Sequence, residues 1–403
     1  MDNGERDVVI TGVGLASSLG VDAHEHVARL ADAISGCVVE EIRFAPYCVH
    51  PLVPLDFSRQ IPKKSDLKQM ETWQRIGVYA AGLALADAGV AENFELLEHT
   101  HLVVAAGSGE RDIAVDCEVL DKLDCDGDST LLAKQVLPSA LRPTLFLAQL
   151  SNMLAGNISI VHGVTGSSRT FMGEEMAGLT AIENAYRRIV SRQTDIVLVG
   201  GALNSEREDL LLGLELGHNL WRGPYAPVWD RARAGGGLIL GSVGAFLVLE
   251  AREHAMARGA RTYARLVDVV TGRCDRGKGS TAGSLTGLYE RLRSPPKGPL
   301  CVLSGASGVE PETSEESEFI QTLPLPGAEV IVRAFGSALG HSVEAHFPAG
   351  LALAALIARH KYLPPALGSS LTEQQTRLIV DNVLVTCVGH WRGEGLAVIE
   401  ATT

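Results

Sequence analysis

Three local patterns in the sequence contain residue types that could bind a metal ion or a nucleotide. Asp124-Cys-Asp-Gly-Asp128 lacks the full ligand spacing of a calcium-binding loop, so it is predicted to be an acidic surface loop. Gly12-Val-Gly14 and Gly107-Ser-Gly109 lack the third glycine, and the acidic residue about 20 positions further on, that a dinucleotide-binding turn needs. The seven cysteines are scattered without a Cys-x-x-Cys pair, which argues against structural zinc and favours a reducing compartment. We therefore expect neither a metal ion nor a bound cofactor.

The elements that must position functional side chains alternate between strand and helix. Apolar runs that end in glycine or polar residues predict buried strands, and apolar residues at helical spacing predict helices. The predicted strands cover 8–14, 102–107, 195–201, 246–250, 300–303, 328–333, 383–388 and 396–399, and the predicted helices cover 66–89, 174–190, 251–258 and 349–359. This alternation predicts parallel sheets that are covered by helices on both faces.

Two segments of the C-terminal part have a different composition. The proline-rich segment 291–299 marks a break in the pattern and is predicted to be a connector. The glutamates between positions 310 and 318 predict an acidic loop that is exposed to solvent.

Composition and charge narrow the class of protein. The chain has 403 residues, of which 46% are hydrophobic and 21% are charged, so it can bury a large core. Its net charge of −13 is opposite in sign to that of a typical nucleic-acid-binding protein. The segment 1–7 is too charged for a signal peptide, and the apolar segment 237–249 is too short to span a bilayer. We expect a cytoplasmic protein without nucleic-acid partners or membrane insertion.

Seven segments along nearly the whole chain are similar, in matching order, to segments of one known family. They are Val8–Gly20, Ala80–Gly89, Gly166–Ile182, Asp195–Gly201, Leu247–Glu250 with His254–Ala260, Gly340-His341 and Pro364-Pro365. The chain thereby resembles the β-ketoacyl-[acyl carrier protein] synthases, which have the thiolase fold. The resemblance implies a dimeric α/β protein with two duplicated halves in alternating helix and sheet layers. The halves are expected at 1–250, with the nucleophile position, and at 251–403, with the histidine positions.

The resemblance also assigns positions to the catalytic groups of the family. The family uses a cysteine that takes the acyl chain, two histidines that donate hydrogen bonds to the thioester oxygen, and a supporting lysine. The corresponding positions here are Glu175 for the cysteine, Ser304 for the first histidine, His341 for the second histidine and Gly336 for the lysine. The loop that gates the acyl pocket corresponds to Thr386, Cys387, Val388, Gly389 and His390. Of the four catalytic positions, His341 alone keeps the residue of the family.

A glutamate is a poor replacement for a cysteine nucleophile. With an ordinary pKa of about 4.3 it is ionised at neutral pH, and its attack on a thioester would form a less stable anhydride. A fixed negative charge at Glu175 would also oppose the enolate charge that His341 stabilises, so condensation is not expected. A simpler interpretation of Glu175 is a carboxylate held by helix N-terminal amides, and His341 could equally be a core histidine. A hydrolytic triad of Ser304, His341 and Glu175 is less favoured because a triad needs an oriented base. Cys301 and Cys387 are expected to be buried small side chains.

The resemblance leaves three candidate functions in fatty acid, polyketide or related acyl-chain synthesis. The first is a non-condensing subunit, similar to a chain-length factor, that partners a cysteine-containing ketosynthase. The second is an active 3-oxoacyl synthase or malonyl decarboxylase that uses His341, and the third is a module that binds an acyl chain or carrier protein without reaction. The implied partners are an acyl carrier protein and a second subunit, in a homodimer or a heterodimer. Arg258, Arg261 and Arg265 could contact an acidic carrier protein, although scattered surface charge is the simpler interpretation.

Overall fold

The computed structural model describes residues 6–31, 38–126, 130, 134, 137–140, 143–277, 279–325, 327–367, 373 and 380–402. Within these residues the strands form a ten-stranded sheet and a small two-stranded sheet of β2 (Val49–His50) and β6 (Leu240–Gly241). The large sheet consists of β1 (Val8–Ala16), β3 (His101–Ala105), β4 (Ser168–Phe171), β5 (Ile196–Leu203), β7 (Val243–Ala251), β8 (Ala264–Gly272), β9 (Leu300–Ser304), β10 (Val330–Ala334), β11 (Asn382–Val388) and β12 (Glu394–Ala401).

The large sheet repeats one strand order in its two halves. From the middle outwards the N-terminal half runs β1-β7-β5-β3-β4, and the C-terminal half runs β8-β12-β11-β9-β10. When the five strands of each half are numbered along the chain, they therefore lie side by side in the same order in both halves: first, fifth, fourth, second, third. The antiparallel pairing of β1 with β8 joins the halves. This duplication confirms the predicted fold class, whereas a domain boundary at residue 250, the penultimate residue of β7, stays a prediction.

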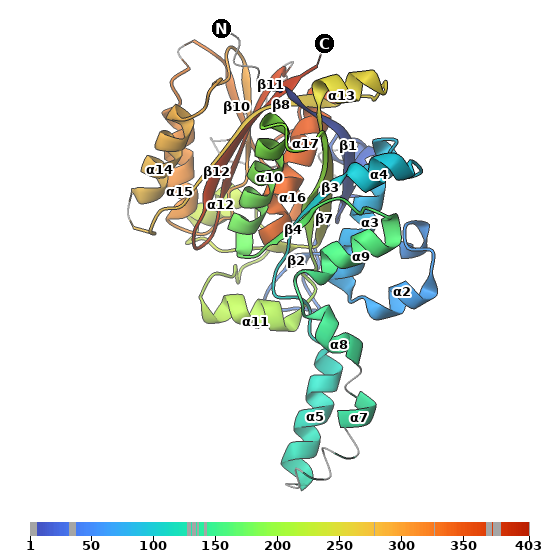
Figure 1. The fold of residues 1–403 in the computed structure, drawn as a ribbon. Helices are drawn as coiled ribbons and strands as arrows, with labels where there is room; N and C mark the ends of the chain where they lie inside the picture. Colours follow the sequence, from blue (N-terminus) through green and yellow to red (C-terminus); the bar gives the residue numbers. More distant parts are fainter. Residues whose placement is uncertain are drawn as a thin grey trace.

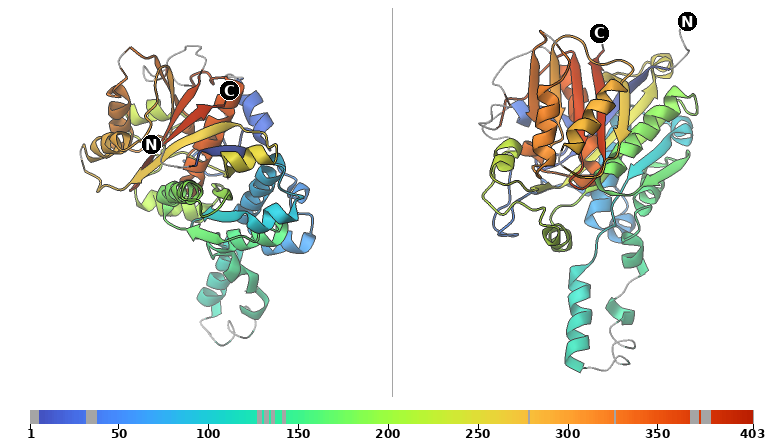
Figure 2. Two further views of the ribbon diagram at one scale, coloured as in Figure 1. Left: turned by 45° about the horizontal axis from the view of Figure 1, so that its top comes forward. Right: turned by 90° about the vertical axis from the view of Figure 1, so that its left-hand side faces the viewer.

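Three layers of helices cover the sheet (Figures 1 and 2). The central layer holds α10 (Glu174–Val190) and α17 (His346–His360), which share one apolar core with strands of both halves. On the outer face of the N-terminal half lie α3 (Thr72–Asp87) and α9 (Met153–His162). On the outer face of the C-terminal half lie α14 (Ser280–Glu290) and α15 (Glu312–Gln321). Helix and sheet layers thus alternate, and the ends of α10 and α17 meet in the interior.

The described part of the chain contains further helices outside this set of six. They are α1 (Ala23–Ala31), η1 (Phe57–Arg59), α2 (Lys64–Gln69), α4 (Phe94–His99), α5 (Ile113–Asp126), α7 (Leu137–Ala140), α8 (Pro143–Ala148), α11 (Glu208–Leu216), α12 (Val228–Arg233), α13 (Arg252–Ala257), α16 (Gly336–Leu339) and η3 (Val343–Ala345). Figure 1 shows that α5 and α7 project away from the layered body. None of the helices in the described part of the chain is long and apolar enough to cross a membrane.

The glycines of β1 allow α3 to approach the strand closely, which explains the Gly-x-Gly pattern without a nucleotide. A Cβ atom at Gly14 would lie 1.9 Å from the backbone oxygen of Ala80. Gly14→Ala is therefore expected to lower the free energy of unfolding by about 1–3 kcal/mol, because the helix must move away. The matched control is Gly283→Ala in α14, where nothing lies within 4 Å of the added Cβ atom. Thermal unfolding of both variants tests this, and equal midpoints would contradict it.

The predicted helix 66–89 and the predicted loop 124–128 differ from the structure. The predicted helix 66–89 is divided, because α2 ends at Gln69 and α3 begins at Thr72. Glu71 and Gln74 form a capping box at this second start, in which each side chain accepts a hydrogen bond from the backbone of the other residue. Residues 124–126 of the predicted acidic loop form the last turn of α5, while Gly127 and Asp128 lie outside the described residues.

The prediction of an exposed acidic loop at 310–318 is wrong. Residues 312–321 form α15, and Glu312, Glu315 and Glu316 are buried. The Glu315 carboxylate accepts hydrogen bonds from the backbone N–H groups of Gly279 and Thr281 at 2.5 and 2.8 Å, and so holds the first turn of α14. Tertiary partners therefore keep these carboxylates out of solvent.

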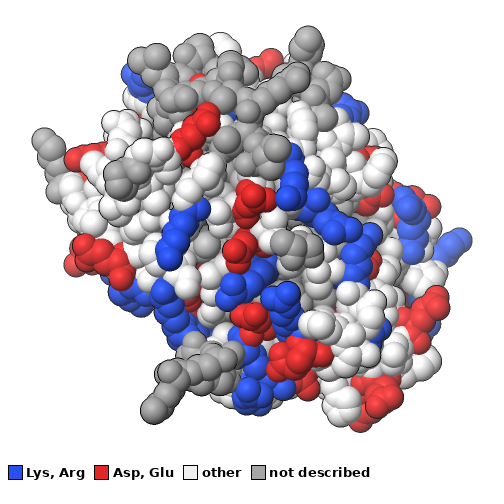
Figure 3. All heavy atoms as spheres, turned by 90° about the horizontal axis from the view of Figure 1, so that it is seen from above, with Lys and Arg blue, Asp and Glu red and all other residues white. Residues whose placement is uncertain are grey.

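The three arginines proposed as a carrier-protein contact are already paired with acidic side chains. Arg258 binds Glu250 through two hydrogen bonds of 2.7 and 2.8 Å. Arg261 pairs with Asp87, and Arg265 pairs with Asp7 and Glu400. Figure 3 shows basic and acidic side chains intermixed on the face of the molecule that is seen from above. The structure thus supports the interpretation of these arginines as scattered surface charge.

Candidate functional site

Glu175 lies at the start of the central helix α10, directly after the edge strand β4. The backbone turns sharply there, with φ of 124° at Gly173 and 54° at Glu174. This positive φ is unusual for a residue other than glycine and marks the turn as strained. The turn directs Glu175 inwards, and its side chain is completely buried. An ionised carboxylate in this place is compatible with the positive end of the helix dipole.

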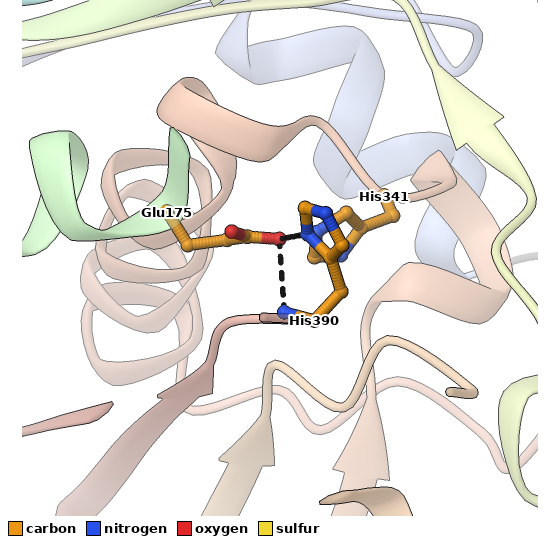
Figure 4. A group of neighbouring side chains, drawn as sticks. All are labelled: Glu175, His341 and His390. Carbon is orange, nitrogen blue, oxygen red and sulfur yellow. Dashed lines mark hydrogen bonds and ion pairs between the residues drawn. The ribbon is translucent and has the colours of Figure 1, made fainter. Parts of the chain in front are cut away.

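Two histidines from distant segments converge on one oxygen of Glu175 (Figure 4). His341, between α16 and η3, donates from Nε2 to Glu175 Oε1 at 2.6 Å. His390, in the turn between β11 and β12, donates from Nδ1 to the same oxygen at 2.7 Å, and its backbone N–H donates at 3.3 Å. All three side chains are buried. The donors that hold Glu175 are therefore histidines and a distant backbone amide, in place of the α10 amides that the simpler interpretation expected.

The electrostatics of this cluster favour a carboxylate and an imidazolium. Burial would raise the pKa of Glu175, but the charge of His390 and the hydrogen bonds from both histidines outweigh burial and hold that pKa well below its usual value. Burial likewise lowers the pKa of His390, yet the charge and hydrogen bond of Glu175 raise it to about 9. At neutral pH the pair thus carries one negative and one positive charge in a nearly dry site.

His346 packs against the ring of His341, and His346 is itself neutral. The two rings are 4.2 Å apart between centroids. Burial, followed by the charge of His341, holds the pKa of His346 well below its usual value. Its Nδ1 accepts from the backbone N–H of Ser342, and its Nε2 donates to the backbone oxygen of Gly305. This neutral ring orients His341 without adding a positive charge to the cluster.

Ser304 and Gly336, the other two positions that the resemblance assigned, do not join the cluster by hydrogen bonds within the described residues. Ser304 Oγ donates to Glu316 Oε1 at 2.6 Å, and Thr386 Oγ1 donates to the same atom at 2.5 Å. Burial raises the pKa of Glu316 to about 6 in spite of these bonds. No hydrogen bond joins Ser304 to His341 in the described structure, so the hydrolytic triad is not assembled. Gly336 begins α16, and a Cβ atom there would lie 3.3 Å from the backbone oxygen of Ala306.

The five positions assigned to the gating loop are buried, and three of them belong to a strand. Thr386, Cys387 and Val388 are the last residues of β11. The Cys387 thiol has a pKa well above its usual value, because of burial and then the charges of Glu175 and Glu316, so it is a poor nucleophile. Cys301 is also completely buried, as expected.

A cavity of about 830 Å³ adjoins the cluster through His390, which lines it. Its polar lining includes Glu174, Glu344 and Arg207. Its apolar lining includes Trp73, Leu203, Leu210, Leu214, Val343 and Trp391. The cavity is therefore large enough for a medium-sized organic molecule and has mainly apolar walls with a charged end.

Two imidazoles and one carboxylate are also possible ligands for a divalent metal ion. Their ligating atoms lie within 4.8 Å of one another. The separations of 2.6 and 2.7 Å are hydrogen-bond lengths, and the raised pKa of His390 means that a proton already occupies its Nδ1. The geometry thus favours a proton-linked ion pair over a metal centre.

Sequence reasoning missed Glu344 and Glu316, and it placed His390 in a gate without an ionic role. Glu344 is an acidic residue in a mostly small or apolar segment that follows His341, and its presence there was the available signal. Glu316 carried no local signal, because its partners Ser304 and Thr386 are 12 and 70 positions away. Glu175 and His390 are 215 positions apart.

Comparisons with known proteins agree with this architecture. The chain is 28% identical over 272 residues to 3-oxoacyl-[acyl-carrier-protein] synthase 2 of Vibrio harveyi, a match that covers 65% of this chain and 62% of that relative. It is 27% identical over 410 residues to the ketoacyl synthase beta subunit of the tetracenomycin polyketide synthase of Streptomyces glaucescens, with 95% of each chain covered.

Solved structures match over nearly the whole chain. The ishigamide ketosynthase/chain length factor superposes with a TM-score of 0.81 at 20% identity, covering 99% of this chain and all of that one. A type II polyketide-synthase acyl-carrier protein in complex with its ketosynthase gives 0.77 at 18% identity, covering 99% and 100%. These likenesses show a shared fold. The family model for the β-ketoacyl synthase N-terminal domain matches residues 5–255. This chain belongs to the β-ketoacyl synthase family.

Proposed function

We propose that this protein is a non-condensing subunit of an acyl-chain synthase and that it partners a ketosynthase with a cysteine nucleophile. The observation that carries this proposal is that His341 and His390 both direct N–H groups at Glu175 Oε1, at 2.6 and 2.7 Å. Two converging donors of this kind are what a thioester oxyanion requires. In this protein a carboxylate of the chain itself already occupies them.

The chemistry of Glu175 opposes both condensation and decarboxylation. A substrate oxygen could reach the two donors only by displacing a buried carboxylate whose pKa is held well below its usual value. The negative charge of Glu175 would also repel the enolate that forms when a malonyl thioester loses CO₂. If Glu175 holds the nucleophile position of the family, the attacking group is a weak nucleophile as well.

The relatives supply further support for a paired subunit. The tetracenomycin relative that matches over 95% of both chains is a ketoacyl synthase beta subunit, and one matching structure is a ketosynthase/chain length factor. Another matching structure contains an acyl-carrier protein bound to its ketosynthase. By this analogy we propose a heterodimer with a ketosynthase, and an acyl carrier protein as the partner that delivers the chain.

The surface near β4 is suited to such a partner. β4 is an edge strand, and the first two of its residues are exposed. An uncovered edge can pair with a strand of another chain. Met172, which follows β4 and lines the cavity, exposes 66% of its surface. Leu212 and Leu216 of α11, whose neighbours Gly213 and Gly217 line the cavity, expose 61% and 75%. In the proposed heterodimer these side chains are covered, and the cavity becomes part of the chamber that accommodates the growing acyl chain.

Affinity purification from the native host, followed by native mass spectrometry, tests the pairing. We expect a heterodimer with a ketosynthase that has a cysteine in its active site, and recovery of a homodimer alone would refute the pairing. The isolated protein is expected to release no CO₂ from malonyl-carrier protein above a buffer blank. Turnover that is lost in His341→Ala would instead establish the alternative function, a malonyl decarboxylase.

A further inference from the structure

Glu344 is a buried carboxyl group that the proposed function does not use. It lies in η3, lines the cavity and exposes 7% of its surface. Among the described residues no other residue donates a hydrogen bond to its side chain; its own backbone N–H is its hydrogen-bond partner, and Arg207 acts on it through its charge alone. Burying a carboxyl group in this way is costly unless a partner arrives from elsewhere.

The backbone around Glu344 is shaped to direct this side chain into the cavity. Val343, directly before it, has a φ of 42°, which is strained for a β-branched residue. On the opposite side Gly107 leaves room, because a Cβ atom there would lie 2.6 Å from Glu344 Oε1. The strained backbone at Val343 and the missing side chain at Gly107 therefore both allow the carboxyl group to lie in this place.

The cations on the cavity wall are already paired with other carboxylates. Arg207 donates two hydrogen bonds to Asp209, at 3.0 and 2.5 Å, and His390 is paired with Glu175. A second carboxylate, Glu174, also lines the cavity. Its buried Oε2 has no hydrogen-bond partner, because Arg392 Nε is 3.9 Å away. The charged end of the cavity thus holds carboxylate oxygens of Glu344 and Glu174 that receive no hydrogen bond from another described residue.

We infer that the cavity binds a molecule with an apolar body and a protonated amine, and that the carboxylates of Glu344 and Glu174 hold the amine. The walls formed by Trp73, Leu203 and Leu210 take up the apolar body. A protonated amine supplies the N–H donors and the positive charge that this end of the cavity lacks.

The state of Glu344 in the empty cavity is consistent with this assignment. Burial, followed by the negative charges of Glu175 and Glu174, raises the pKa of Glu344 to about 7. A bound cation offsets both effects and stabilises the ionised form. In the context of the proposed function, on which this last step rests, the molecule is an acyl chain that carries an amino group.

Calorimetry with hexylamine, hexan-1-ol and hexanoate at pH 8.5 tests the inference on the full chain. At this pH Glu344 is ionised and the amine is protonated. A charge-assisted hydrogen bond to a buried acceptor is worth about 1.5–3 kcal/mol, so hexylamine should bind roughly tenfold or more tightly than hexan-1-ol. Hexanoate should bind most weakly. Equal affinity of the amine and the alcohol for the wild-type protein overturns the inference, and this comparison needs no variant.

Variants then assign the effect to the two carboxylates. Glu344→Gln keeps the shape of the side chain and is expected to remove most of the preference for the amine, while Glu174→Gln removes part of it. The control Glu95→Gln removes an exposed carboxylate in α4 and should leave the preference unchanged. A preference that survives in Glu344→Gln contradicts the assignment. Because free amines need neither a partner nor a carrier protein, failure here is independent of failure of the proposed heterodimer.

Discussion

Glu175→Ala is expected to lower the free energy of unfolding by about 3–5 kcal/mol, the usual cost of removing one member of a buried ion pair. The alanine leaves the imidazolium of His390 buried without its counter-charge, and it leaves the Nε2–H of His341 without an acceptor. His341 Nδ1 already has no hydrogen-bond partner. A flip of the ring would therefore not give the unpaired nitrogen a new partner. Denaturant unfolding, followed by tryptophan fluorescence at pH 7, measures the change.

The neighbouring residue provides a matched control for this prediction. Glu174 is in the same helical turn, but its side chain is 29% exposed and its closest cation is 3.9 Å away. Glu174→Ala should therefore change the free energy of unfolding by less than about 1 kcal/mol. If both variants unfold like the wild type, the cluster of Glu175, His341 and His390 does not stabilise the fold, and Glu175 does not hold the two histidine donors as proposed.

Between pH 6.5 and 9 the wild-type protein is expected to lose roughly 3 kcal/mol of stability through His390 alone. The pKa of this residue is about 9 in the folded protein and about 6.5 in an unfolded chain. The folded state therefore binds the proton more tightly. The resulting stabilisation is complete below pH 6.5 and disappears as the pH rises through 9.

Other groups titrate in pH windows that overlap only the two ends of this one. Burial raises the pKa of Glu344 to about 7 and that of Glu316 to about 6, so both destabilise the fold as the pH rises from about 4.5 through those values. The lowered pKa of Glu175 has the opposite sign, since its stabilisation is present above about pH 4.3 and is lost as the pH falls through its folded pKa. Burial of Cys387 adds a loss of stability above about pH 8.5.

Glu175→Gln separates the contribution of His390 from these groups. The amide keeps the size of the side chain but removes the charge that raises the pKa of His390, so most of the loss of stability between pH 7 and 8.5 should disappear. In the wild type, NMR of ¹⁵N-histidine-labelled protein should show a ring that is still protonated at pH 8. A spectrum in which every histidine is neutral at pH 8 would show that the ion pair does not form.

The order of strands and helices could be read from the sequence, because each element depends mainly on its own residues. The strand at β1 and the helix at α10 follow from apolar periodicity and from the glycines that border them. The approach of Glu175 and His341 was also accessible, since the resemblance to β-ketoacyl synthases places both in one site. The divided start of α3 was missed, because a capping box is a subtler signal than a run of apolar residues.

The tertiary structure alone decided the charge state and the partners of the site. No local pattern indicates that His390 contacts Glu175, 215 positions away in the sequence. Nor does any local pattern indicate that Ser304 and Thr386 donate hydrogen bonds to Glu316. The run of glutamates from 310 to 318 suggested solvent, yet packing of α15 against α14 removes several of them from water. Burial and the charge of distant neighbours determine the pKa of a carboxyl group and the pairing of a histidine, and both are properties of the packed chain. The sequence by itself therefore determined the architecture and the residue types at the site, and only the fold decided that Glu175 occupies the donors that a substrate would need.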